Sequence, residues 1–340
     1  MTLQSSNASA VQVPPSVTIA EGVRSATFAI TTTPVSTNTS VVISGVYGTT
    51  KTANVTVTAA TLSSLTRNPT SVVGGTNSTG TVTLNGAAPA GGALVTLQSS
   101  NASAAQVPPS VTIAGGARSA TFTITTIPVS ANTSAVISGV YGLTRTTTLT
   151  VNAPTLSSLT RSPSAVVGGS NSSGTLTLSG PSPSGGAVVT LQSSNPSAAQ
   201  VPASVTIPEG SAGATFTITT SGVASTTSAK ISAVYGNTKT TSLSVTAASL
   251  ISLTLNPSAV TGGSTSTATL TLNGAAPPSG AVIRLTSSKT SAAQVPATAT
   301  VPGGSNSITF TVTTSSVHGT SAMISGTYRG TTRRSTLTVQ

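Results

Sequence analysis

The chain has 340 residues, of which 13 are Lys or Arg, 2 are Asp or Glu and 1 is His, so its formal net charge at pH 7 is +11. It contains no Cys and no Trp, and charged residues make up only 4% of the sequence. Nucleophilic triads, paired-carboxylate hydrolysis and carboxylate calcium sites need groups that this composition lacks. We therefore expect neither an enzyme nor a metal or other cofactor.

An internal repeat of 94 residues organises the sequence, and such a period is typical of repeated modules. The repeat is marked by Leu3, Leu97, Leu191 and Leu285, and equally by Phe28, Phe122, Phe216 and Phe310. We predict one incomplete unit at 1–58 and complete units at 59–152, 153–246 and 247–340. The incomplete unit lacks the 36 residues equivalent to 59–94.

The incomplete unit opens with MTLQSSN, which recurs as VTLQSSN from Val95 and from Val189. Met1 therefore occupies a strand position that is expected to face a core. We hypothesise that the natural chain extends upstream of Met1. Residues 1–58 are predicted to lack their first two strands, which would leave sheet edges and core uncovered and favour pairing with other chains.

The complete unit 59–152 has the pattern of short strands separated by turn residues such as Asn68-Pro69, Gly74-Gly75 and Asn85-Gly86. Strands are predicted at 62–66, 79–85, 93–99, 110–114, 119–126, 133–141 and 144–151. About seven strands in a unit of this length predict an immunoglobulin-like antiparallel β-sandwich. The fold class is therefore all-β, with one sandwich for each complete repeat.

Alternation along the strands predicts which side chains face the core, because successive residues point to opposite faces of a sheet. In the segment ATFTITT, Phe122 and Ile124 are expected inside, and Thr121, Thr123 and Thr125 are expected in water. The strand 133–141 is apolar on both faces. Its third copy has Lys230 in place of Val136, so this face is solvent and Ile137 with Tyr141 is core. The residues Val42, Val136 and Met323 would then be exposed, and they form a candidate lateral contact.

The joints between units are short, for example Ala59-Ala60-Thr61, and contain no Gly. Such joints should restrict bending far more than a Gly/Ser linker does. Similar joints repeated along a chain predict a semi-rigid rod, the geometry of a stalk or filament.

The positive charge is spread along the chain, with net charges of +1, +3, +2 and +5 for the successive units. Only Arg329, Arg333 and Arg334 form a cluster. Single-strand nucleic-acid binding normally adds aromatic stacking platforms, whereas the one Phe and one Tyr of each unit occupy core-like positions. We expect no nucleic acid as partner. We interpret the positive charge instead as a source of weak attraction to an anionic surface polysaccharide. No run of apolar residues reaches the length of a membrane span.

Hydroxyl-bearing residues suggest two further functions. N-glycosylation sequons occur at Asn7, Asn38, Asn54, Asn77, Asn101, Asn132 and Asn171. Outward Thr rows such as Thr121, Thr123 and Thr125 also resemble the flat Thr arrays of ice-binding sheets, although Thr is an ordinary outward strand residue.

Segments such as LSSLTRNPTSVVGGTNSTGTVTLNGAAPAGGALVTLQSSN and SGVYGLTRTTTLTV resemble the bacterial immunoglobulin-like (Big-type) tandem repeats of secreted adhesins and cell-surface fibres. This resemblance covers every unit and implies a spacer, stalk or polymer. VTIPEGSAGATFTITT also resembles the strand-turn-strand segment of Calx-beta modules, but the chain lacks the acids of their calcium sites.

These observations together predict a non-enzymatic, extracellular or cell-surface structural protein. Its partners would be further copies in a fibre or neighbouring repeats of a longer chain. The alternative is an adhesive module that itself binds glycan or cell-wall polymer.

Overall fold

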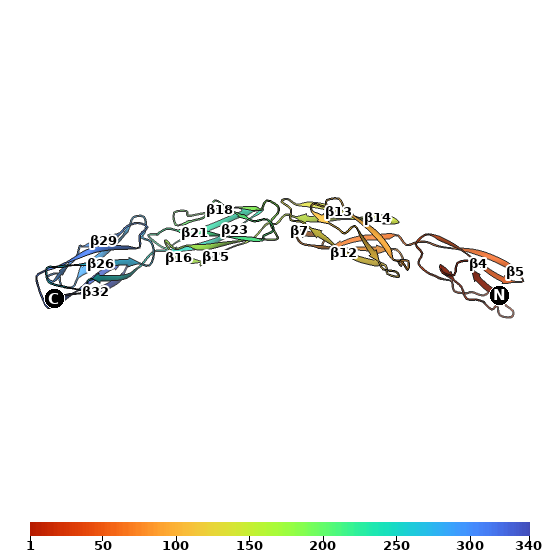
Figure 1. The fold of residues 1–340 in the computed structure, drawn as a ribbon, viewed down its shortest axis with the longest axis horizontal. Helices are drawn as coiled ribbons and strands as arrows, with labels where there is room; N and C mark the ends of the chain where they lie inside the picture. Colours follow the sequence, from red (N-terminus) through yellow and green to blue (C-terminus); the bar gives the residue numbers. More distant parts are fainter. The chain divides into compact units, whose positions relative to one another are not determined.

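The computed structural model describes all 340 residues, and every regular element in it is a β-strand (Figure 1). The predicted all-β class is therefore confirmed. The chain divides into two compact parts, Met1–Pro154 and Thr155–Gln340, which are described separately.

Residues 62–152 form a sandwich of two sheets. One sheet has four strands in the order β10 (Ala105–Gln106), β12 (Ser119–Thr126), β8 (Ser78–Leu84) and β6 (Leu62–Asn68). The other has five strands in the order β11 (Ser110–Ile113), β9 (Ala93–Ser99), β13 (Thr133–Tyr141), β14 (Leu143–Asn152) and β7 (Ser71–Val73). All pairings are antiparallel except that of β7 with β14. Each of the seven predicted strands is present.

The core lies between the two sheets and follows the predicted alternation. Ile124 and Ile137 are fully buried and Phe122 is 7% exposed, whereas Thr121 and Thr123 face solvent. Tyr141 is partly buried and packs against this core. The apolar side chains of one repeat therefore form one closed hydrophobic cluster.

Two short strands, β7 and β10, were not predicted. β7 has three residues and pairs in parallel with β14, Ser71 lying opposite Thr150. β10 has two residues, Ala105 and Gln106, and pairs with the end of β12. Strands of two or three residues are too short to show a periodic pattern in the sequence. They form because a distant strand presents an unpaired edge.

Two more sandwiches with the same topology occupy the second part of the chain. In residues 156–246, the four-stranded sheet has the order β15 (Leu156–Ser162), β17 (Ser172–Leu178), β21 (Gly213–Thr220) and β19 (Ala199–Gln200). The five-stranded sheet has the order β16 (Ala165–Val167), β23 (Asn237–Thr246), β22 (Thr227–Tyr235), β18 (Ala187–Ser193) and β20 (Ser204–Ile207). In residues 250–339, the four-stranded sheet has the order β24 (Leu250–Asn256), β26 (Thr265–Leu272), β30 (Ser307–Thr314) and β28 (Ala293–Gln294). The five-stranded sheet has the order β25 (Ala259–Val260), β32 (Thr331–Val339), β31 (Thr320–Tyr328), β27 (Ala281–Ser287) and β29 (Thr298–Val301). Each sandwich has its own hydrophobic cluster.

These two sandwiches also touch each other. The backbone N–H of Ala275 donates a hydrogen bond of 2.8 Å to the carbonyl of Gly168, and Val167 packs against the core of the following sandwich. A Cβ on Gly222 would lie only 2.2 Å from the carbonyl oxygen of Ala276, so the two backbones approach as closely as glycine permits. The contact consists of backbone and small side chains.

A row of three paired residues crosses the inner face of the four-stranded sheet in each complete unit. Arg67 pairs with Gly80, and Gly80 pairs with Phe122. The Phe122 ring lies directly over the glycine, where a Cβ would be 2.2 Å from Cζ. Arg161, Gly174 and Phe216 repeat this row, whereas the last sandwich has Leu255, Ala268 and Phe310 instead.

The two arrangements of this row differ in packing. The Arg67 and Arg161 guanidinium groups donate to Thr147 Oγ1 and Thr241 Oγ1, but the Nε atom of each is buried without a partner. In the last sandwich Leu255 and Ala268 are buried, and the ring of Phe310 is only partly buried. The glycine therefore makes room for the aromatic ring.

One serine is buried at the same place in all three sandwiches. Ser78, Ser172 and Ser266 are 1–3% exposed, and each donates its hydroxyl to a proline carbonyl at 2.7–2.8 Å. The acceptors are Pro69, Pro163 and Pro257.

We expect the substitution Ser172→Ala to lower the free energy of unfolding of its sandwich by about 1–3 kcal/mol, because the carbonyl of Pro163 would lose its partner in a dry site. Urea unfolding followed by circular dichroism measures this change. Ser173→Ala, one residue away on the solvent face, is the control and should change stability by less than about 0.5 kcal/mol.

Residues 1–58 form only part of a sandwich. The strands are β1 (Thr2–Ser5), β2 (Val11–Gln12), β3 (Thr31–Thr32), β4 (Thr39–Tyr47) and β5 (Thr49–Val57). Four residues, Ala10, Val11, Val41 and Ile43, make up the buried cluster. The equivalent segment 59–94 contains three complete strands, β6, β7 and β8, of which the short β7 was not among the two strands predicted to be lacking.

Candidate functional site

The side chains with catalytic potential lie apart in different repeats. Glu21 is exposed, and exposed Glu209 accepts hydrogen bonds from Ser184 Oγ at 3.2 Å and Gly185 N at 3.3 Å. His318 is also exposed, and its Nδ1 lies 2.7 Å from the carbonyl oxygen of Gln340. No three His, Cys, Asp or Glu side chains gather into a potential metal site. The structure has no helix that could cross a membrane.

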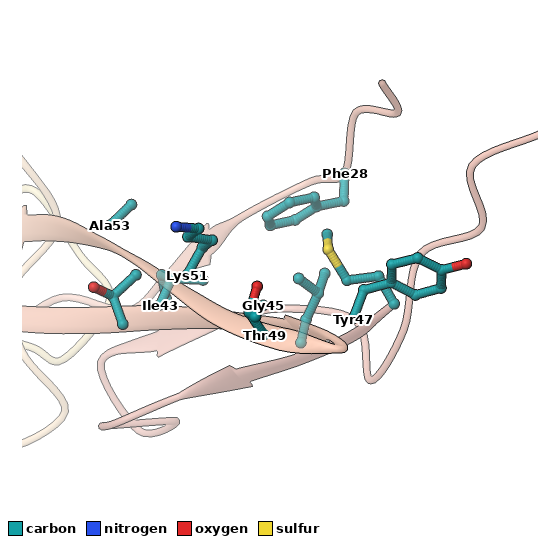
Figure 2. A pocket seen from close by; sticks show the side chains of 10 residues that line it. Phe28, Ile43, Gly45, Tyr47, Thr49, Lys51 and Ala53 are labelled. Carbon is teal, nitrogen blue, oxygen red and sulfur yellow. The ribbon is translucent and has the colours of Figure 1, made fainter. Parts of the chain in front are cut away.

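One opening lies at the uncovered core of residues 1–58. It has a volume of about 290 Å³ and is lined by Met1, Leu3, Phe28, Ile43, Gly45, Tyr47, Thr49, Lys51, Thr52 and Ala53. Figure 2 shows Phe28 on one side of this opening and Gly45, Thr49 and Lys51 of the β4–β5 hairpin on the other. Tyr47 is 84% exposed, whereas its equivalents Tyr141 and Tyr235 are partly buried against a core.

Met1 partly replaces a residue of the missing segment. In the complete unit, the side chain of Leu62 lies 3.3 Å from the position that a Cβ would take on Gly139. In the incomplete unit, the sulfur of Met1 lies 3.3 Å from the equivalent position on Gly45. Met1 therefore points inward, as predicted, but remains 38% exposed because the opposite sheet is lacking.

The following segment, 59–94, cannot close this opening within the same chain. β6 begins beside the start of β14, where Arg145 Nε donates to the carbonyl of Ser63 at 2.8 Å, and β7 lies beside the end of β14. A covering strand on residues 1–58 would therefore start near the beginning of β5. β5 has nine residues, about 30 Å, and the four residues between Val57 and Leu62 span at most about 14 Å.

The three candidate lateral-contact residues lie on outer sheet faces. Val42, Val136 and Met323 are 39%, 40% and 41% exposed. Lys230 is exposed at the equivalent position. Their role in a lateral contact stays a prediction.

Other exposed apolar residues of the same faces were missed by the sequence reasoning. Leu94, Val188 and Val282 are 56–59% exposed, and Val46, Val140 and Val234 are 43–48% exposed. Strand alternation could have identified Leu94, because it adjoins the buried Val95. The outer faces are thus more apolar than expected.

The seven sequon asparagines fall into two groups. Asn54, Asn77 and Asn171 are exposed, and their side chains make no hydrogen bond within the chain. The side chains of the other four, Asn7, Asn38, Asn101 and Asn132, accept hydrogen bonds from nearby backbone or hydroxyl groups. Asn38 and Asn132 hold the backbone N–H of Ala59 and Ala153 at the joints. Glycosylation at these positions stays a prediction.

The outer face of each four-stranded sheet carries rows of hydroxyls. Thr66, Thr81 and Thr121 are paired across three strands. The row recurs as Thr160, Thr175 and Thr215, and again as Thr254, Thr269 and Thr309. These rows offer hydrogen-bond donors and acceptors but hold no ionisable group.

Two packed sheets, antiparallel apart from the parallel β7–β14 pairing and its equivalents, define each complete unit as an immunoglobulin-like β-sandwich. The chain is thus a tandem series of such sandwiches, as predicted. No family model matches the sequence, and no curated protein matches it.

Several solved structures are similar to the chain. The D0-D1 domain of intimin is 15% identical with a TM-score of 0.24, over 55% of this chain and 99% of that one. The Escherichia coli adhesin FdeC is 19% identical with a TM-score of 0.30, over 82% and 96%. Domains 1–6 of the surface layer protein SbsC are 19% identical with a TM-score of 0.27, over 92% and 46%. These values lie below the level at which function can be inferred.

Proposed function

We propose that the chain is a non-enzymatic extracellular structural protein whose immunoglobulin-like repeats form a surface filament or an adhesin stalk. The main support is that every complete repeat closes around its own hydrophobic cluster. Modules of this kind are stable without a partner and can be repeated to any length. The low content of charged groups and the absence of Cys agree with a role that involves no catalysis.

The joint inside Thr155–Gln340 supports a load-bearing role. The hydrogen bond from Ala275 to Gly168 and the packing of Val167 tie the two sandwiches together. Flexibly linked domains do not need such a contact, whereas a stalk has to resist bending.

Electron microscopy of the native protein at the cell surface tests this proposal. A filament or stalk predicts continuous fibres or rods that an antibody against the repeats labels along their length. Label confined to the cytoplasm would refute the proposal.

Lateral assembly of such fibres can be tested at the candidate contact residues. The substitutions Val136→Lys and Met323→Lys should abolish side-by-side association, because unpaired ammonium groups would be buried in the contact. The melting temperature should not change, since Lys230 shows that the fold accepts lysine here. Sedimentation velocity of the full chain measures the association. An unchanged association constant would exclude this surface.

The alternative function is adhesion, in which a repeat itself binds a glycan. It is favoured by the Thr rows of the four-stranded sheets, because aligned hydroxyls can bind sugar hydroxyls. A glycan array probed with the full chain separates the two functions: a pure stalk binds no neutral glycan, whereas an adhesin binds a defined set.

A further inference from the structure

We propose that the last sandwich binds an acidic, carboxylate-bearing polysaccharide through a cationic surface formed by Arg284 and Arg334, with Arg329 in the adjoining turn. All three side chains are exposed. Arg284 lies on β27 and Arg334 on β32, on either side of β31, and Arg329 lies in the turn that joins β31 to β32.

The strand register places these side chains close together. Arg284 on β27 lies opposite Thr327 on β31, and Arg334 on β32 lies opposite Ser325. Arg284 lies between the buried Ile283 and Leu285, and Arg334 lies an odd number of residues from the buried Leu337 and Val339, so both side chains point to the outer face. They flank β31 on adjacent rungs, so their Cα atoms are about 12 Å apart at ordinary strand spacings.

The turn adds one more positive group. Arg329 adopts a φ of 51° in the two-residue turn, and its guanidinium lies 5.9 Å from the centre of the Tyr328 ring. Arg333 on β32 lies opposite the buried Gly326, so it points to the other face of the sheet and is not part of the surface.

No acidic side chain offsets this charge. Residues 247–340 contain five Lys or Arg and no Asp or Glu. Arg67 and Arg145 of an earlier repeat donate hydrogen bonds to Thr147 and Ser63, whereas the guanidinium groups of Arg284, Arg329 and Arg334 make no hydrogen bond within the chain. Their donors and their positive potential are consequently available to a ligand.

The cationic surface is not required by the fold. The position of Arg284 is occupied by Thr96 and Thr190 in the other complete repeats, and that of Arg334 by Thr146 and Thr240. The same sheet therefore forms without these arginines. The charges of Arg284 and Arg334 are therefore specific to the last repeat, whereas the position of Arg333 is basic in every repeat, where it is Lys51, Arg145 or Lys239.

The chemistry of the surroundings favours a polysaccharide over a nucleic acid. Guanidinium groups bind carboxylates through paired hydrogen bonds. Hydroxyls of Thr286, Ser325 and Thr327 lie among the arginines and can bind sugar hydroxyls. The two aromatic residues of this repeat, Phe310 and Tyr328, are partly buried against the core, so the face lacks an exposed platform on which bases could stack.

The experiment titrates the full chain with fluorescently labelled alginate oligosaccharides at low salt. Wild-type protein should bind, and the double variant Arg284→Thr/Arg334→Thr should bind about tenfold more weakly, because two exposed charge contacts are lost. The variant carries the residues of the sister repeats, so its melting temperature should stay unchanged. Binding of the wild type should weaken as salt is raised.

The control is Arg24→Thr/Lys230→Thr, which removes the same charge from two other repeats where both side chains are exposed. It should keep wild-type affinity within about twofold, because neither side chain belongs to the last repeat. Equal losses in both variants, no binding to alginate, or tighter binding to oligothymidylate than to alginate would overturn the proposal.

Discussion

Replacement of Phe122 by Ala should destabilise its sandwich by about 3–5 kcal/mol, the usual cost of removing a large buried side chain. The ring is 7% exposed and lies directly on Gly80, so no Cβ is present to fill the space that it leaves. For a domain of this size, the melting temperature of that sandwich should fall by more than about 12 °C.

Calorimetry of the full chain measures this effect, because each sandwich has its own hydrophobic cluster. The matched control is Phe310→Ala in the last sandwich, where the ring is only partly buried and rests against Ala268. Its loss should be clearly smaller. Equal losses at both positions would contradict the role assigned to the glycine.

The second large effect should appear as coupling between two positions of the same row. Gly174→Ala alone should destabilise its sandwich by about 1–3 kcal/mol, because the new Cβ would lie 2.2 Å from the Phe216 ring. Arg161→Leu alone should be neutral or stabilising, because it removes a buried Nε atom without a partner.

Together these two substitutions recreate the Leu255, Ala268 and Phe310 row of the last sandwich. The double variant should therefore be more stable than the sum of the single changes predicts, by about 0.5–3 kcal/mol. A double-mutant cycle from urea unfolding supplies the coupling energy. A value indistinguishable from zero would show that the row does not pack as a unit.

Strand alternation was sufficient to predict the sandwich and its core. It placed Phe122 and Ile124 inside and Thr121 outside, because alternation is a property of the strand itself. Lys230 resolved the ambiguous strand in the same way. Local patterns therefore determine which face of each strand is buried.

Features that depend on distant partners could not be predicted in this way. β7 forms only because β14 offers a free edge, and Met1 fills the place of Leu62 only because a sheet is lacking. The cationic surface is an intermediate case. The cluster at Arg329, Arg333 and Arg334 was visible in the sequence, but only the strand register shows that Arg334 shares its face with Arg284 and not with Arg333.

The scarcity of acidic groups has a consequence for the surroundings in which the sandwiches can function. Most proteins unfold in acid because carboxylates that are ionised and paired in the native state take up protons. Here the only two carboxylate side chains are exposed at loops, and the cores consist mainly of apolar residues. Acidification should therefore change the free energy of unfolding little, so that such a chain keeps its fold at a pH where most proteins unfold.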